Sequence, residues 1–157
     1  MSIYADYKGK RYPFVMKEGK YRLRSRVKEM DFEEIIDLEG KRHKDKFVKE
    51  VRIEDIDVIY EIQYKIIYQG KEYSPFTIGE LIIENDKITI FSKDYEDYEK
   101  NGFHKKEQFV FVKEIAINNI EGIIEIKKPI LDFKGLPEEK KYLSKNSISH
   151  CINTFKN

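Results

Sequence analysis

Residues 47–62, FVKEVRIEDIDVIYEI, and residues 111–126, FVKEIAINNIEGIIEI, decide the fold of this chain. Nine of the sixteen ungapped positions are identical, which is far more than chance gives even in a chain rich in Lys and Ile. The identical pairs are Phe47/Phe111, Val48/Val112, Lys49/Lys113, Glu50/Glu114, Ile53/Ile117, Ile56/Ile120, Ile59/Ile123, Glu61/Glu125 and Ile62/Ile126. Self-similarity of this kind indicates an internal duplication.

The similarity extends upstream of both segments. Residues 7–14, YKGKRYPF, match residues 68–76, YQGKEYSPF, with one inserted residue, and residues 21–25 align with residues 88–92. Val, Ile, Tyr and Phe dominate each copy and glycines punctuate it, which is typical of strands joined by tight turns. We therefore expect one hairpin around Lys8-Gly9-Lys10 and a second around Gln69-Gly70-Lys71.

These patterns predict a mainly β fold with an internally duplicated small β-barrel or sheet unit, SH3-like or similar, and a short C-terminal helical tail. The predicted domains are residues 1–62 for copy one, 63–126 for copy two and 127–157 for a partly helical tail that packs on the β body. Two barrels and one fused sheet system both fit the sequence.

Two segments carry helical signals. Residues 31–38, DFEEIIDL, fit a short helix capped by Asp31, and they fit a strand equally well. Residues 135–139, GLPEE, resemble a helix start, because proline and acidic residues favour the first turn. One face of the expected terminal helix carries apolar residues at helical spacing, namely Ile148, Cys151, Ile152 and Phe155.

The net charge of +1 conceals a segregation of charge along the chain. Residues 1–52 contain 15 Lys and Arg against 10 Asp and Glu (+5), and residues 53–126 contain 8 against 16 (−8). Such a field steers charged partners. No apolar run approaches the roughly 20 residues of a membrane span, and the single cysteine permits no intramolecular disulfide. We expect a cytoplasmic protein without membrane association.

Residues able to carry chemistry are few. His43 and His104 lie in charged segments with no carboxylate at an orienting spacing, and His150 and Cys151 are adjacent, so on a helix they point about 100° apart. No glycine-rich phosphate loop, nucleophile elbow, calcium loop or paired-histidine metal signature occurs in the sequence. We expect no catalytic residues, no metal and no cofactor.

Two surfaces could bind a partner. Residues 20–28 alternate so that Arg22, Arg24 and Arg26 share one strand face, which suits phosphates or an acidic protein but is equally typical of a solvated edge strand. Acids and tyrosines alternate in the second surface, which we expect to contact a protein partner or to be a polar connection. Its residues are Asp94, Tyr95, Glu96, Asp97, Tyr98 and Glu99.

The tandem Tyr-x-Gly-Lys-x-Tyr hairpins (7–12 and 68–73), each followed by Phe-Val-Lys-Glu-Val/Ile and Ile-x-x-Ile, resemble small immunity proteins of bacterial polymorphic-toxin systems. The likeness covers residues 3–126. It implies a protein that binds and inhibits a cognate toxin, and we expect that toxin to offer a basic cleft. A nucleic-acid-binding tandem small-barrel module that uses the basic strand face is the alternative, against which the −8 segment and the small net charge count.

Overall fold

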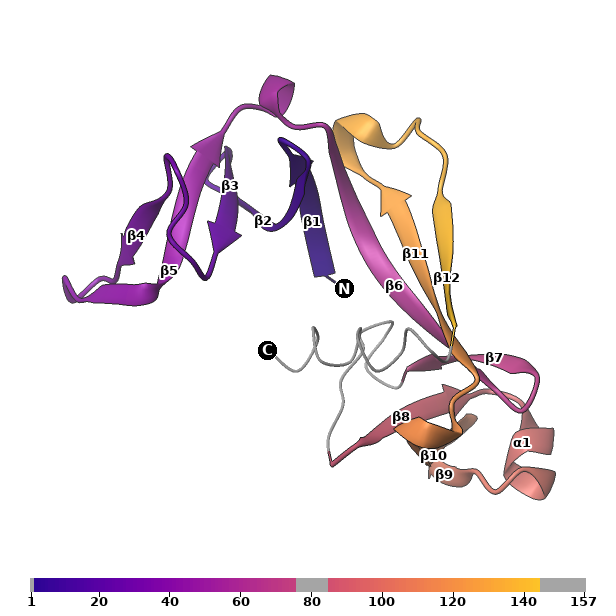
Figure 1. Ribbon diagram of the computed structural model, residues 1–157. Helices are drawn as coiled ribbons and strands as arrows, with labels where there is room; N and C mark the ends of the chain where they lie inside the picture. Colours follow the sequence, from indigo (N-terminus) through magenta and orange to yellow (C-terminus); the bar gives the residue numbers. More distant parts are fainter. Residues whose placement is uncertain (1, 76–84, 145–157) are drawn as a thin grey trace. The chain divides into compact units, whose positions relative to one another are not determined.

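The computed structural model describes residues 2–75 and 85–144, which fall into two compact units (Figure 1). The N-terminal unit contains Ser2–Glu61 and Lys128–Pro137. The C-terminal unit contains Ile62–Lys127 and the described residues from Glu138 onward. None of the helices in the described ranges is long and apolar enough to cross a membrane.

The N-terminal unit is an antiparallel sheet with the strand order β4-β5-β3-β2-β1. Its elements are β1 (Ser2–Tyr7), β2 (Lys10–Lys17), β3 (Lys20–Ser25), β4 (Glu33–Ile36), β5 (Arg42–Val51) and the 3-10 helices η1 (Ile53–Asp55) and η3 (Leu131–Phe133). Alternate strand residues supply the core, because successive side chains point to opposite faces of a sheet. The buried cluster comprises Ala5, Tyr7, Tyr12, Phe14, Leu23, Phe32, Phe47, Val51, Ile56 and Ile59.

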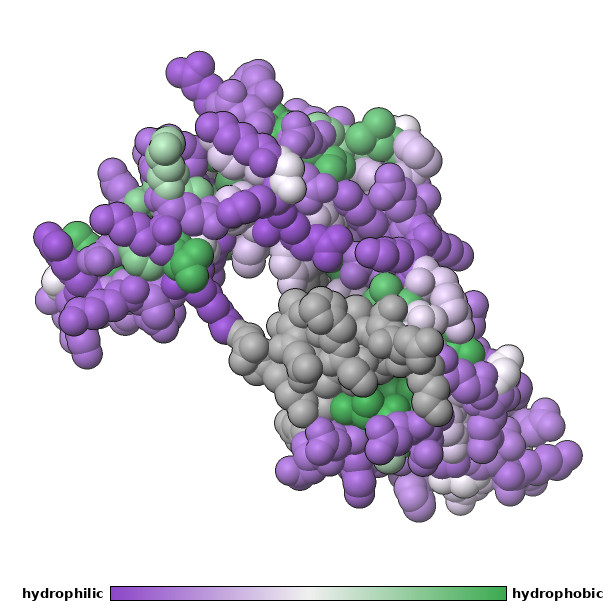
Figure 2. Space-filling view, viewed as in Figure 1, coloured by the Kyte–Doolittle hydropathy of each residue, from purple (hydrophilic) through white to green (hydrophobic). Residues whose placement is uncertain are grey.

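The C-terminal unit has the strand order β6-β7-β8-β10-β9, and β11 pairs with both β6 and β12. Its elements are β6 (Val58–Tyr68), β7 (Lys71–Pro75), β8 (Lys87–Ser92), α1 (Tyr95–Lys100), β9 (His104–Glu107), β10 (Val110–Ala116), η2 (Ile117–Asn119), β11 (Gly122–Pro129) and β12 (Glu139–Ser144). Two unit boundaries lie inside strands, one between Glu61 and Ile62 in β6 and one between Lys127 and Lys128 in β11. On the face drawn in Figure 2, hydrophilic side chains cover most of the surface and apolar ones lie in small patches.

The two predicted hairpins are confirmed, and their turns have the same backbone conformation. The φ angles are 49° and 79° at Lys8 and Gly9, and 50° and 75° at Gln69 and Gly70. Two consecutive positive φ values define the mirror-image turn that matches the twist of antiparallel strands. Glycine at the second position adopts this conformation without a steric penalty.

Strand register is also the same in the two units. In the N-terminal unit Leu23 pairs with Lys49 and Ser25 with Phe47. In the C-terminal unit Ile90 pairs with Lys113 and Ser92 with Phe111. The aligned sequence segments therefore occupy matching positions in the β3–β5 and β8–β10 pairs, and a slip of one residue in either pair would turn its apolar side chains to the wrong face.

Burial of the aligned residues follows this register in part. Phe47 and Phe111 are both buried, at 5% and 4% exposure. Ile53 and Ile117 are both half-buried and begin the 3-10 helices η1 and η2, each of which precedes a strand. Ile62 is buried whereas Ile126 is half-buried, so this pair is matched less closely.

Of the two predicted forms, barrel and sheet, the described strands form the sheet and not the closed barrel. The first and last strands of each order, β4 with β1 and β6 with β9, do not pair with each other, so both runs are open sheets. Strand twist alone does not close a sheet. Closure requires a matching tilt and stagger of the strands, which local sequence does not encode.

The predicted helix start at residues 135–139 is also wrong. Residues 139–144 form β12, because Leu143 is buried opposite Ile123 and the pairing with β11 overrides the local helical signal. Residues 33–36, left open between helix and strand, form β4. The predicted apolar helical face from Ile148 to Phe155 lies outside the described residues.

Candidate functional site

The acidic segment at residues 94–99 forms helix α1 and its N-cap in the C-terminal unit, and is not an irregular loop. Asp94 is the N-cap, and its carboxylate accepts a hydrogen bond of 3.0 Å from the Glu96 amide. The Asp94 amide in turn donates to the Ser92 hydroxyl at 3.0 Å. A helix of this length is marginal alone, so side-chain contacts with the sheet must hold it in place.

Asp97 is the anchor of α1 and is only 2% exposed. Its carboxylate accepts hydrogen bonds from Ser92 at 2.6 Å, from Asn101 at 2.7 Å and from the Tyr73 hydroxyl at 3.0 Å. The Lys71 ammonium lies 3.8 Å away. Asp97 therefore faces the sheet and a partner cannot reach it, unlike the other residues of the predicted acidic surface.

The environment of Asp97 favours its charged form. Burial alone would raise the pKa of Asp97, but the donors on Ser92, Asn101 and Tyr73, together with the charge on Lys71, outweigh burial and lower it. Burial and the hydrogen bond to Asp97 raise the pKa of Tyr73 to about 12. The Tyr73 hydroxyl thus remains a donor to an ionised carboxylate under ordinary conditions.

The outer side of α1 presents two exposed tyrosines, Tyr95 at 59% and Tyr98 at 40% exposure. Their ring centroids lie 5.7 Å apart, and the Tyr98 ring stacks on Phe111 of β10 at 5.1 Å with an interplanar angle of 16°. Tyr95 meets Phe111 edge-on at 6.1 Å. The rings are therefore held in fixed positions although large parts of them face water.

Charged residues surround these tyrosines. Asp94, Glu96 and Glu99 are exposed, and Glu96 lies 3.9 Å from Lys100 one turn along the helix. We call Asp94, Tyr95, Glu96, Tyr98 and Glu99 the α1 patch. Exposed aromatic side chains inside a polar rim are the usual composition of a protein-binding surface.

The predicted basic face is divided by the structure. Strand β3 ends at Ser25, so Arg26 lies beyond it. Arg22 is half-buried and shares a hollow with Asp31, Glu33 and Glu50. Arg24 and Arg26 are exposed and line a different hollow, a groove of about 830 Å³ in the N-terminal unit.

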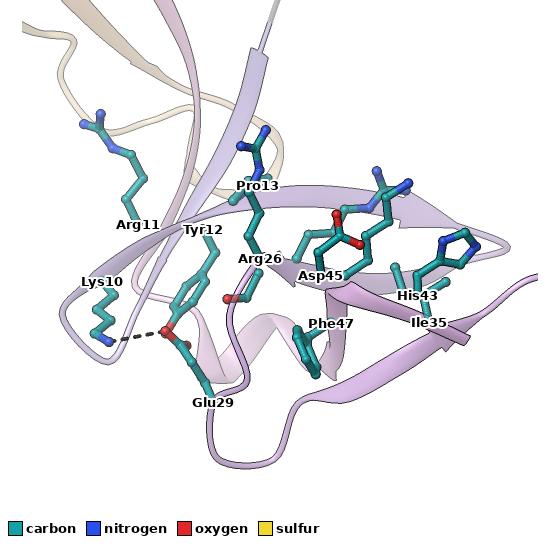
Figure 3. Close-up of a pocket in the computed structure, with 13 residues that line it drawn as sticks. Lys10, Arg11, Tyr12, Pro13, Arg26, Glu29, Ile35, His43, Asp45 and Phe47 are labelled. Atoms are coloured by element: carbon teal, nitrogen blue, oxygen red, sulfur yellow. Dashed lines mark hydrogen bonds and ion pairs between the residues drawn. The ribbon is translucent and has the colours of Figure 1, made fainter. Parts of the chain in front are cut away.

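This groove, which we call the β3–β5 groove, is lined by both cations and apolar residues (Figure 3). Lys10, Tyr12 and Glu29 lie at one end of it, and Ile35 and His43 at the other. The remaining lining residues are Arg11, Pro13, Arg24, Ser25, Arg26, Asp45, Lys46 and Phe47. The sequence indicated Arg24 and Arg26 but gave no sign that β4 and β5 would supply the opposite wall.

Two histidines, His43 and His104, lie in the described part of the chain. His43 Nε2 lies 3.2 Å from Asp37 Oδ2, a pairing across a turn that its sequence spacing did not reveal. Backbone amides, Lys41 first, donate to Asp37 and lower the pKa of that carboxyl, with His43 contributing. His104 is exposed on β9. Among the described residues no group of three or more His, Cys, Asp and Glu could hold a metal ion.

A pair of carboxylates at equivalent places was missed by the sequence argument. Glu29 accepts a hydrogen bond from the Tyr12 hydroxyl at 2.5 Å and lies 3.3 Å from Lys10. Asp97 has the same kind of partners in Tyr73 and Lys71. Both Tyr-x-Gly-Lys-x-Tyr hairpins are evident in the sequence. Nothing in the motif predicted that its Lys and its second Tyr would each contact one carboxylate from a later segment.

Comparison with known proteins adds one partial match. A family model described as Uncharacterised conserved protein UCP033725 matches residues 1–77. The matched stretch contains all five strands β1 to β5 and the β6–β7 hairpin. No curated protein and no solved structure matches the chain.

Proposed function

We propose that this chain is a non-catalytic binding protein, an immunity protein that binds and inhibits a cognate bacterial toxin in the cytoplasm. The observation that carries the proposal is the α1 patch, in which Tyr95 and Tyr98 are exposed yet fixed against Phe111. The hairpin motifs that resemble immunity proteins support the same class.

Fixed tyrosines suit tight binding for an entropic reason. An exposed side chain that is already ordered loses little conformational freedom when a partner covers it. Tyr98 is stacked on Phe111 and Tyr95 contacts both rings, so their contribution to binding is not spent on ordering them. Tyrosine is also among the residue types that dominate binding energy at protein interfaces.

The acids of the α1 patch define the chemistry of the partner. Asp94, Glu96 and Glu99 are exposed at the rim, where charges mainly accelerate encounter with an oppositely charged surface. We therefore infer that the toxin presents a basic cleft, of the kind that enzymes acting on nucleic acids use to hold phosphates. Blocking such a cleft with tyrosines and carboxylates would inhibit the toxin without any chemistry by this chain.

The test is protection against the product of the neighbouring gene. The candidate toxin is co-expressed with the wild-type chain and with Tyr95→Ala and Tyr98→Ala, and the complexes are compared by binding kinetics. Replacing a hot-spot tyrosine by alanine should accelerate dissociation by about thirtyfold, equivalent to about 2 kcal/mol. Changing Glu96 or Glu99 to Gln should mainly slow association and flatten its salt dependence.

Tyr142→Ala is the matched control, because Tyr142 is a 60% exposed tyrosine outside the α1 patch. All variants retain Asp97, so the carboxylate that anchors α1 is unchanged in each of them. Full protection and unchanged kinetics in a Tyr95→Ala/Tyr98→Ala double variant would contradict the proposal.

We further propose that the two strand runs arose by duplication of one ancestral unit. Support comes from the shared strand order, the equal register and the matching turns at Lys8-Gly9 and Gln69-Gly70. Ring pairs match as well, since Tyr12 and Phe32 lie 5.3 Å apart, as do Tyr73 and Phe103.

Nucleic-acid binding is the second candidate, favoured by Arg24, Arg26 and Lys46 in the β3–β5 groove. Titration with single- and double-stranded oligonucleotides at about 0.15 M salt distinguishes it. We expect weak binding. Submicromolar affinity that falls in Arg24→Gln and Arg26→Gln variants would favour this candidate over toxin inhibition.

A further inference from the structure

Exposed aromatic side chains are concentrated in the C-terminal unit. Among the described residues the exposed Tyr and Phe side chains are Tyr95, Tyr98, Phe109 and Tyr142, and all of them belong to this unit. Tyr95 and Tyr98 are held against Phe111. Phe109, by contrast, is 70% exposed and makes no ring contact with any residue of the described ranges. Burial within the folded chain therefore does not explain a large apolar residue at this position.

Phe109 also has a backbone conformation that a bulky residue rarely adopts. It lies in the turn between β9 and β10 with a φ of 63°. In this left-handed region the Cβ atom crowds the following carbonyl oxygen, so glycine is the residue that fits best. Three other hairpin turns place glycine at their second left-handed position, namely Gly9, Gly19 and Gly70. The geometry of the turn therefore does not explain Phe109 either.

The N-terminal unit has no aromatic residue at the corresponding position. Extended upstream by two residues, the ungapped alignment of the repeats places Phe109 opposite Asp45, which lies inside β5. The β4–β5 hairpin is longer than the β9–β10 hairpin, and its turn contains Leu38. Both α1 and Phe109 therefore belong to what distinguishes the C-terminal unit from the N-terminal one.

Phe109 lies close to the α1 patch. It precedes Phe111 by two residues, so the Cα atoms of the two phenylalanines are at most about 7.6 Å apart. Tyr98 stacks on Phe111 with 5.1 Å between the ring centroids. A standard protein interface covers about 800 Å² on each partner, which corresponds to a disc with a radius of about 16 Å. A partner centred on α1 is therefore wide enough to reach the β9–β10 turn.

We propose that Phe109 inserts into an apolar pocket of the partner protein, beside the basic cleft that the α1 patch covers. The inference rests on the proposed function and adds to it a second contact and a requirement on the toxin. A pocket that covers an exposed aromatic ring removes a large apolar area from water, which slows dissociation. A strained conformation at an exposed site is typical of a position that serves binding and not folding.

The experiment measures two properties of Phe109 variants, the kinetics of binding to the candidate toxin and the thermal unfolding of the free chain. Phe109→Gly removes the ring and fits the left-handed position. It should accelerate dissociation by about tenfold, whereas the midpoint of thermal unfolding should stay unchanged or rise. Phe109→Leu keeps an apolar side chain and should dissociate more slowly than Phe109→Gly.

Leu38→Ala is the matched control, because Leu38 is an exposed apolar residue in a hairpin turn of the N-terminal unit, and it should leave the dissociation rate unchanged. Dissociation of Phe109→Gly at the wild-type rate, with faster dissociation of Tyr95→Ala, would overturn this inference and leave the proposed function standing. A clear fall in the unfolding midpoint of Phe109→Gly would assign Phe109 a structural role and also overturn the inference. Failure of the wild-type chain to bind the candidate toxin would contradict the proposed function and this inference with it.

Discussion

The N-terminal and C-terminal units share a strand order and a hairpin turn, which we call the shared frame, and differ in one connection between strands. Both contain the same strand order, the same hairpin turn and a lysine placed over a tyrosine ring, Lys49 over Tyr7 at 5.7 Å and Lys113 over Tyr68 at 5.1 Å. They differ in the connection after the third strand, which forms α1 in one unit and leaves a groove in the other.

In each unit, the connection after the third described strand determines how deeply a carboxylate is buried. Each hairpin directs a lysine and a tyrosine at one carboxylate, Glu29 or Asp97. The side chain of Asp97, on the inner side of α1, is 3% exposed, whereas that of Glu29, beside the groove, is 21% exposed. The unit with the longer connection therefore buries its carboxylate, Asp97, in a hydrogen-bond network. In the other unit Glu29 remains in a partly solvated ion pair.

Replacement of the equivalent core residues should have the largest effect on stability. Leu23 and Ile90 are both 0% exposed and lie opposite Lys49 and Lys113. Leu23→Ala and Ile90→Ala should each lower the free energy of unfolding by about 2–5 kcal/mol, because each leaves a cavity. Chemical denaturation measures the loss, and a cost below about 1 kcal/mol at either site would break the equivalence.

The carboxylates should respond unequally. Asp97→Asn should cost about 1–3 kcal/mol, because an amide cannot accept all the hydrogen bonds that reach the buried carboxylate. Glu29→Gln should cost less, about 1 kcal/mol or below, because Glu29 is partly solvated and water can replace its partners. Equal costs in thermal or chemical unfolding would contradict the view that α1 buries the network.

The pH dependence of unfolding stability tests the contribution of the Asp97 carboxylate. The pKa of Asp97 is lowered on folding, so its stabilisation is fully present above the ordinary Asp pKa of about 3.9 and is lost as pH falls through the lower folded value. Wild-type stability should therefore decline below about pH 4, and the decline should be shallower in Asp97→Asn. Unfolding free energies measured between about pH 2 and pH 7 check this.

The left-handed positions before Phe32 and Phe103 should give the smallest effects. Gly102→Ala places a Cβ atom 3.4 Å from Lys113 Nζ at φ 77° and should cost about 1 kcal/mol. Asp31→Gly relieves strain at φ 67° but removes the 3.5 Å ion pair with Lys49, so its net change should lie within about 0.5 kcal/mol. Chemical denaturation distinguishes the two, and a larger cost for Asp31→Gly would contradict equivalent turns.

The mainly β class, both hairpins and the alignment of residues 21–25 with 88–92 were predictable because they rest on local patterns. Alternating apolar residues and Gly at turn positions act over a few residues. Barrel closure and the helix start at residues 135–139 were not borne out, for a different reason. Strand β12 exists because Leu143 is buried opposite Ile123, a contact between distant parts of the sequence.

The candidate sites show the same division. Residues 94–99 could be recognised as a possible binding surface from composition, but the inward direction of Asp97 depends on Tyr73 and Asn101. Arg24 and Arg26 were recognisable as cations, whereas the groove that they line requires β4 and β5 to fold back beside them. Side-chain direction and concavity are tertiary properties, which period and composition do not specify.

The most direct test of the shared frame is strand register in solution. Nuclear Overhauser contacts between paired strands should join Leu23 to Lys49 and Ser25 to Phe47 in one unit, and Ile90 to Lys113 and Ser92 to Phe111 in the other. Finding all four pairs would agree with the same strand register in both units. A register shifted by one or more residues in either unit would contradict it, because the aligned side chains would then occupy different faces of their sheets.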